Sequence, residues 1–139
     1  MIAIVKRGLV ASALALSVAS ASAPAVAQTA APGLAGTWTA AGSGLVRLVI
    51  AAPPGGATVT AFGSCHPTAC PWGTRPLQIF APNVSAKIGS VGLATYTTTF
   101  SETRVIVTLS AVRTLRVETL THFTDKSGRS NYVNTVIMH

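Results

Sequence analysis

The chain has 139 residues, of which 49% are hydrophobic and only 9% are charged, and its formal net charge is +7. The cations are scattered along the chain instead of forming the dense basic patch that nucleic-acid or heparin binding requires. We therefore exclude nucleic acid as a partner and expect a single domain, since one core is adequate at this length.

The first 27 residues have the pattern of a secretory signal peptide. Lys6 and Arg7 precede an apolar stretch from Leu9 to Ala21, which is too short to span a bilayer. No later apolar run approaches the length of about 20 residues that a transmembrane helix needs. We expect a periplasmic or secreted protein whose mature form has no transmembrane segment.

Small residues mark where the signal peptide is expected to end. The A-x-A pattern that ends at Ala27 predicts cleavage before Gln28, and Ala21-Ser22-Ala23 is the alternative. Two cations leave with residues 1–27, so the formal charge falls from +7 to +5. The mature chain is then expected to consist of a flexible N-terminal segment, residues 28–36, and a β-barrel-like domain, residues 37–139.

From position 37 onward, short runs rich in Val, Ile, Thr, Tyr and Phe alternate with Gly, Pro, Ser and Asn, a pattern typical of an all-β protein. Turns are expected over 53–56, 101–102, 112–113 and 125–128. Eight antiparallel strands with short turns predict an up-and-down meander, which leaves edges exposed unless it closes into a barrel. The strands are expected to begin near Thr37, Leu45, Thr58, Leu77, Leu93, Arg104, Leu115 and Asn131.

Alternation is clearest in the run from Leu115 to Phe123, which predicts one inward and one outward face. Thr119 and Thr121 belong to the inward set; we expect their hydroxyls to bond to each other or to backbone groups across the sheet, with ligand binding as the alternative. The inward set is Leu115, Val117, Thr119, Thr121 and Phe123, matched by Val105, Val107 and Leu109 in the preceding strand, and the outward set is Arg116, Glu118 and His122.

Cys65 and Cys70 enclose four residues between two strand-like runs. In an exported chain this spacing predicts a disulfide, worth about 2 kcal/mol by loop closure. The alternative is a zinc or copper site formed by Cys65, His66 and Cys70, but a closed zinc site needs four ligands. We expect no metal and no cofactor.

The three acidic residues do not suggest a catalytic pair. Glu102 and Asp125 lie in predicted turns, and Glu118 points outward, as does His122. Nucleophilic or glycosidic chemistry needs such groups gathered in one cleft. We therefore do not expect an enzyme.

A polar run joins the last two predicted strands. The turn itself explains Asp125, Ser127 and Gly128, but it does not require the three residues Arg129, Asn131 and Tyr132. A guanidinium, an amide and an amphipathic ring at a barrel rim are suited to a polar ligand or a partner. We therefore take these three and Trp72 as candidate binding residues; the alternative for Trp72 is to close the barrel end.

The segment Leu34-Ala35-Gly36-Thr37-Trp38 resembles the G-x-W start of calycin barrels, a group that includes lipocalins, avidins and bacterial metalloproteinase inhibitors. The resemblance implies a barrel in which Trp38 closes one end. Similarity to the inhibitors implies an N-terminal segment, here Gln28 to Pro32, that enters a protease cleft.

Two longer motifs resemble a group of exported bacterial proteins of uncharacterised function. They are a C-x-P-x-x-C-x-W-G loop at Cys65–Gly73 and an F-T-D-x-S-G-R-S-N-Y turn at Phe123–Tyr132. This resemblance implies export and carries no activity.

These observations predict an exported, non-enzymatic binding module for a small polar or anionic ligand or a cell-envelope component, whether protein or polysaccharide. The alternative is a protein-interaction module such as a periplasmic protease inhibitor. A monomer and a dimer are equally compatible with the sequence, because an open sheet edge can pair two subunits.

Overall fold

The computed structural model describes residues 29–42, 44–53 and 55–139. The runs rich in Val, Ile, Thr, Tyr and Phe form eight β-strands in it. Those residues contain no helix and therefore no helix long and apolar enough to cross a membrane. The strands are β1 (Gly36–Thr39), β2 (Leu45–Ala51), β3 (Ala57–Gly63), β4 (Cys70–Phe80), β5 (Val91–Thr97), β6 (Ser101–Ala111), β7 (Thr114–Phe123) and β8 (Tyr132–Met138).

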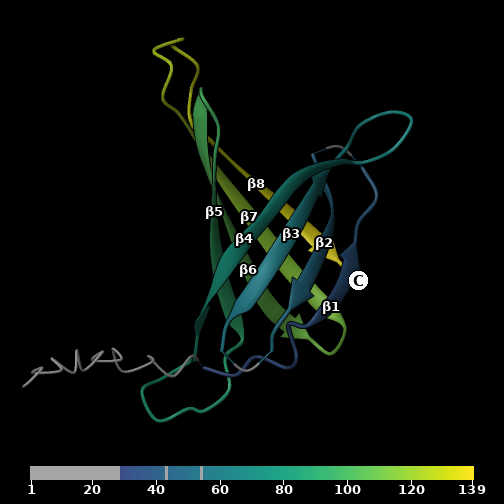
Figure 1. Ribbon diagram of the computed structural model, residues 1–139, viewed down its shortest axis with the longest axis vertical. Coiled ribbons are helices and arrows are strands. Elements are labelled where there is room, and N and C mark those ends of the chain that lie inside the picture. The colour runs from purple at the N-terminus through teal and green to yellow at the C-terminus, as the bar shows by residue number, and fades with distance from the viewer. Residues whose placement is uncertain (1–28, 43, 54) are drawn as a thin grey trace, which may run out of the picture.

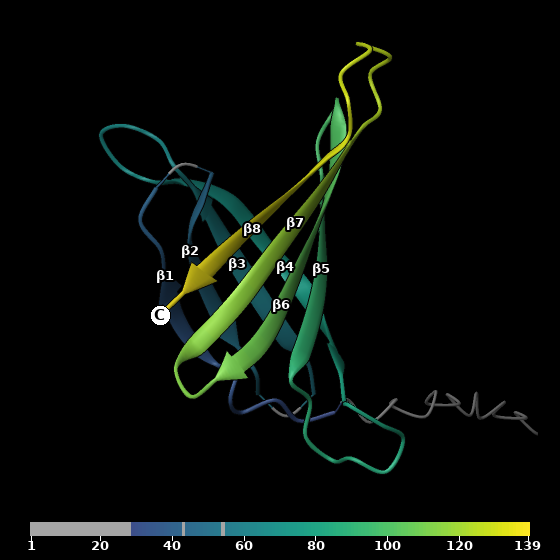
Figure 2. The same cartoon turned by 180° about the vertical axis from the view of Figure 1, so that it is seen from behind.

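Each strand pairs antiparallel with the next in the order β1 to β8, so the predicted all-β, up-and-down meander is confirmed. The sheet curls until its first and last strands approach, as Figure 1 and, from behind, Figure 2 show. Thr39 and His139 exchange two backbone hydrogen bonds there, each 3.0 Å from nitrogen to oxygen. The barrel is therefore nearly closed.

The inward face predicted for β6 and β7 is confirmed. Val105, Val107, Leu115 and Val117 are buried, while Arg116 between them is exposed. This follows from the period of two in a strand, which sends alternate side chains to opposite faces. The core continues around the barrel through Leu45, Leu48, Ile50, Val59, Leu77, Ala94 and Met138.

The described part of the N-terminal segment packs against the barrel. Ala30 forms a bridge with Ile88, and its carbonyl accepts a hydrogen bond of 2.7 Å from the Gly89 amide. Ala31 and Leu34 are buried in the core, and burying their apolar surface favours this arrangement. The predicted signal peptide, residues 1–27, and Gln28 lie outside the described residues.

The beginning of β4 differs most from the prediction, because this strand starts at Cys70 and not near Leu77. Pro71 and Pro76 suggest a break, since proline cannot donate to a sheet ladder. However, β5 pairs only with the segment from Gln78 to Phe80. The earlier part of β4 therefore pairs on one side alone, and proline is tolerated on such an edge.

The predicted turn at residues 101–102 is also wrong, because both residues belong to β6 and pair with β7. The turn lies three residues earlier, where the backbone amides of Phe100 and Ser101 donate to the Thr98 hydroxyl oxygen at 3.3 and 3.0 Å. Threonine hydroxyls can form such turns. The predicted turn at residues 112–113 is confirmed, with Arg113 at φ 55°.

Candidate functional site at the open end of the barrel

The two ends of the barrel differ. Toward the end that carries the loop between β3 and β4, strands β4 and β5 diverge (Figure 1). A cavity of about 520 Å³ lies at this end, and we call it the mouth cavity. Its walls are Gly44, Leu45, Pro71, Trp72, Arg75, Tyr96, Thr97, Thr98, Phe100, Ser101, Thr103, Thr119, Thr121, Phe123, Tyr132 and Asn134.

Trp72 reaches the mouth cavity because of a bulge in β4. Ala61 pairs with Gly73 and Phe62 pairs with Pro71, which leaves Trp72 as the extra residue. A bulge redirects a side chain, and Gly73 takes the positive φ of 96° that an L-residue rarely adopts. The indole packs against Gly63, where an added Cβ would lie only 2.6 Å from the indole nitrogen.

The predicted disulfide between Cys65 and Cys70 is confirmed and lies next to this bulge. Cys70 is the first residue of β4 and pairs with Gly63. Because both sulfurs are oxidised, neither is available as the thiolate that the alternative metal site requires. The described residues contain no group of three or more His, Cys, Asp or Glu side chains placed to share a metal ion.

Tyr96, on β5, connects its strand to β3, which is not its neighbour in the sheet, beneath the mouth cavity. Its hydroxyl donates a hydrogen bond of 3.0 Å to the Val59 carbonyl on β3. Burial raises the pKa of Tyr96 to about 12, although the Ala61 backbone and the Arg75 charge partly oppose the shift. The Trp72 ring meets the Tyr96 ring edge to face, with centroids 5.8 Å apart. Tyr96 is thus a fixed, neutral wall of the cavity.

Arg75 brings a positive charge to the same wall. It pairs in register with the buried Val59, so both side chains project from the inner face of the sheet. Its guanidinium carbon lies 5.9 Å from the centroid of the Tyr96 ring. Among the described residues no ion pair involves Arg75. The three carboxylates pair instead with other arginines: Glu102 with Arg104 at 3.1 Å, Glu118 with Arg116 at 2.8 Å and Asp125 with Arg129 at 2.6 Å.

A row of polar side chains on β6, β7 and β8 continues the wall from Tyr96, because Thr103 is the register partner of Tyr96. Thr103, Thr121 and Tyr132 are consecutive partners in the register of these strands, so they share the inner face. The Thr103 and Thr121 hydroxyls form a hydrogen bond of 3.1 Å, so Thr121 bonds to a side chain across the sheet and not to Thr119 or to the backbone groups that were predicted. Thr119 and Asn134 form the next pair inward.

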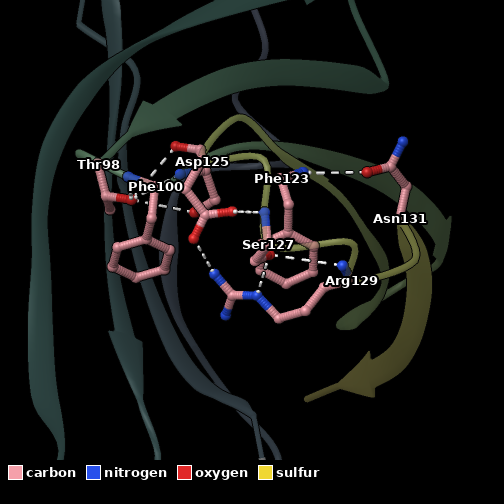
Figure 3. Close-up of polar contacts among 8 residues, drawn as sticks. Thr98, Phe100, Phe123, Asp125, Ser127, Arg129 and Asn131 are labelled. Atoms are coloured by element: carbon pink, nitrogen blue, oxygen red, sulfur yellow. Dashed lines mark hydrogen bonds and ion pairs between the residues drawn. The ribbon is translucent and has the colours of Figure 1, made fainter.

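Arg129 has many contacts within the loop between β7 and β8, and Figure 3 shows its side chain extending toward Asp125. Its guanidinium lies 3.9 Å from the centroid of the Phe123 ring, and its Nε donates to the Ser127 hydroxyl oxygen at 2.8 Å. The pKa of Asp125 is lowered, first by a hydrogen bond with the Ser127 side chain and further by Arg129. This predicted binding residue therefore stabilises a loop beside the cavity.

Asn131 also has a contact within the chain. Its side-chain oxygen accepts a hydrogen bond of 3.0 Å from the Phe123 amide (Figure 3). Neither Asn131 nor Arg129 lines the mouth cavity. Asn131 instead lines a groove of about 460 Å³ on the outer face, which we call the outer groove; its walls are Glu102, Arg104, Leu120, Thr121, His122, Asn131, Tyr132 and Val133.

The structure brings together two of the four predicted binding residues, Trp72 and Tyr132, as walls of one cavity. Sequence reasoning missed Arg75 and Tyr96. A signal for Arg75 was available, because alternation counted back from the inward Leu77 places it inside. Because the strand was expected to start near Leu77, Arg75 was placed before it and the alternation was not extended to Arg75.

No family model matches this chain, and no curated protein or solved structure matches it. The function proposed below therefore rests on the geometry of the site.

Proposed function

We propose that this chain is an exported, non-enzymatic binding module that holds a small polar or anionic ligand in its mouth cavity. The observation that carries the proposal is the combination, in one cavity, of aromatic walls, hydroxyls and the guanidinium of Arg75. Ligand sites are usually concave and largely apolar, with a few convergent polar groups. A guanidinium without a carboxylate partner in the described chain favours an anionic group in the ligand.

Export is supported by two independent features. Residues 1–27 have the composition of a signal peptide. The disulfide between Cys65 and Cys70 is compatible with an oxidising compartment, where such bonds persist. We accordingly place the protein in the periplasm or outside the cell.

A binding role without catalysis is supported by the arrangement of the acidic groups. Glu102 and Glu118 form ion pairs with arginines of their own strands, and Asp125 forms one within its loop. None of the described residues that line the mouth cavity carries a carboxylate.

The test is native mass spectrometry of protein purified from the periplasm, compared with its denatured mass. We expect an additional mass in the native spectrum that is lost in Arg75→Gln. The matched control is Arg104→Gln, which removes the same charge from the outer groove and should retain the additional mass. Loss of that mass in Arg104→Gln alone would contradict the proposal and place the ligand in the outer groove.

A protein-interaction module is the second candidate, favoured by exposed apolar residues on the outer face. Leu120, Val133 and Ile137 are all exposed there, on β7 and β8. Leu120 and Val133 are partners in register and lie side by side, and exposed apolar side chains that gather in this way are typical of interaction sites. If this candidate holds, Leu120→Lys should abolish partner binding while Arg75→Gln leaves it unchanged, measured by co-purification. The inhibitor version requires residues 28–32 to enter a protease cleft, although Ala31 is buried in the barrel core.

A further inference from the structure

The hydroxyl-bearing wall of the mouth cavity offers both donors and acceptors. The hydrogen bond between Thr103 and Thr121 uses one of their two O–H groups, so the pair retains one donor and free lone pairs. Thr119 adds a hydroxyl, and Asn134 adds an amide with two donors and one acceptor. A ligand that satisfies this wall must itself both donate and accept hydrogen bonds, as a set of hydroxyl groups does.

The aromatic walls require a ligand that also has an apolar surface. Trp72, Tyr96 and Tyr132 present ring surface to the same cavity. A sugar ring suits both walls, because its C–H groups give it an apolar face while its hydroxyls project from the edge. A planar aromatic ligand or an acyl chain would cover the rings but leave Thr119 and Asn134 without partners, which is unfavourable for polar groups removed from water.

The charge in the cavity selects among sugars. Among the described residues that line it, Arg75 is the cation and none is a carboxylate. Guanidinium and carboxylate form paired, charge-assisted hydrogen bonds with favourable geometry. A neutral sugar would leave this charge unused, and an amino sugar would be repelled by it.

We infer that the mouth cavity binds an acidic sugar, a polyhydroxylated ring that carries one carboxylate, and this inference rests on the function proposed above. Arg75 holds the carboxylate, the aromatic side chains pack against the ring, and Thr103, Thr119 and Asn134 bond to its hydroxyls. The cavity of about 520 Å³ lies within the size range of small-molecule sites.

The two tryptophans of the chain allow a direct test, because each belongs to one end of the barrel. Trp72 lines the mouth cavity, whereas the Trp38 indole is buried and bonded to the Leu34 carbonyl. The mature protein is titrated with sodium glucuronate, glucose and sodium benzoate while the indole N–H signals are recorded by NMR. We expect glucuronate to shift the Trp72 signal saturably and leave that of Trp38 unchanged. Glucose and benzoate should each bind at least about tenfold more weakly, because each lacks one class of contact worth about 1.5 kcal/mol or more.

Variants assign the contacts. Arg75→Gln should weaken glucuronate binding about tenfold or more and leave glucose unaffected, whereas Arg104→Gln should change neither. Thr103→Val, which preserves shape, should weaken glucuronate binding and spare benzoate; Thr103→Ser, which restores a hydroxyl, should recover glucuronate affinity. Retention of the Trp38 signal verifies that each variant is folded.

The possible failures are distinguishable. Benzoate that binds as tightly as glucuronate, with dependence on Arg75, overturns the sugar assignment and leaves the proposed binding function intact. Glucose that binds as tightly as glucuronate overturns the acidic requirement. If no probe at millimolar concentration moves the Trp72 signal, the acidic-sugar assignment fails; the proposed function fails as well only if Arg75→Gln keeps the additional mass in the native spectrum.

Discussion

The two tryptophans show how one residue type serves opposite purposes at the two ends of the barrel. Trp38 is only 6% exposed, and its indole nitrogen donates a hydrogen bond of 2.9 Å to the Leu34 carbonyl. Trp72 is 37% exposed and packs against Gly63 and, edge to face, against Tyr96. The closed end uses its indole to complete the core, whereas the open end leaves an indole available to a ligand.

The inner face of the sheet becomes more polar from the closed end of the barrel to the open end. Near the closed end, Leu109, Leu115 and Met138 are partners in register and are apolar. Toward the mouth, the corresponding row contains Thr103 and Thr121. Hydroxyls are costly in a dry core unless they are bonded, so their position at the mouth is consistent with a cavity that admits water or a polar ligand.

The largest expected effect is a difference in stability between variants of the two tryptophans. Trp38→Ala should lower the free energy of unfolding by about 3–5 kcal/mol, because it removes a buried ring and leaves a cavity. Trp72→Ala should cost less, about 1–2 kcal/mol, since 37% of its surface already faces water. Urea unfolding of the two variants gives the comparison directly. Equal losses would mean that Trp72 also belongs to the core and that the two ends are energetically alike.

The disulfide should have the next largest effect, and that effect should be confined to the mouth. Replacing Cys65 and Cys70 together by alanine should lower the free energy of unfolding by about 2 kcal/mol through loop closure. Because Cys70 starts the strand whose bulge carries Trp72, we also expect the Trp72 indole signal to shift while that of Trp38 stays in place. Thermal unfolding and NMR measure the two effects. An equal shift of both indole signals would contradict a local role.

Tyr96→Phe should cost about 1 kcal/mol, because it removes the hydrogen bond to the Val59 carbonyl. Its pKa of about 12 also predicts a pH dependence. Folding favours the protonated phenol, so this stabilisation is complete below about pH 10, the unfolded value, and is lost as the pH rises toward 12. Unfolding measured between pH 9 and 12 should therefore decline less steeply in Tyr96→Phe than in the parent protein. Identical slopes would show that the hydroxyl is not protected by burial.

Asp125→Asn should have the smallest effect, because this carboxylate lies in an exposed loop. The lowered pKa of Asp125 means that its contribution is present above its unfolded pKa and is lost as the pH falls through the folded one. We expect faster amide hydrogen exchange at Ser127 and Arg129 in the variant, with almost no change in global unfolding. The parent protein at acidic pH should approach the same exchange rates. A large global loss would show that the loop supports the barrel and does not merely border its mouth.

Much of the fold could be predicted from local patterns. The alternation from Leu115 to Phe123 identified the inward face, the turn at residues 112–113 was placed correctly, and the spacing of Cys65 and Cys70 identified the disulfide. Each of these features depends on residues close together in sequence, where strand periodicity and turn chemistry act directly.

The candidate site was harder to predict from the sequence than the fold, because it depends on pairing between strands. The sequence by itself determined an all-β meander and identified two aromatic residues of the mouth, Trp72 and Tyr132, while export stays a prediction from it. Only the tertiary structure decided that residues 70–77 of β4 lie on an edge where prolines are tolerated, and that Arg75 and Tyr96 share the cavity wall. It also decided that Arg129 is occupied by Asp125 and Phe123. The physical reason is that alternation assigns faces within one strand, whereas register and divergence between strands determine which side chains meet.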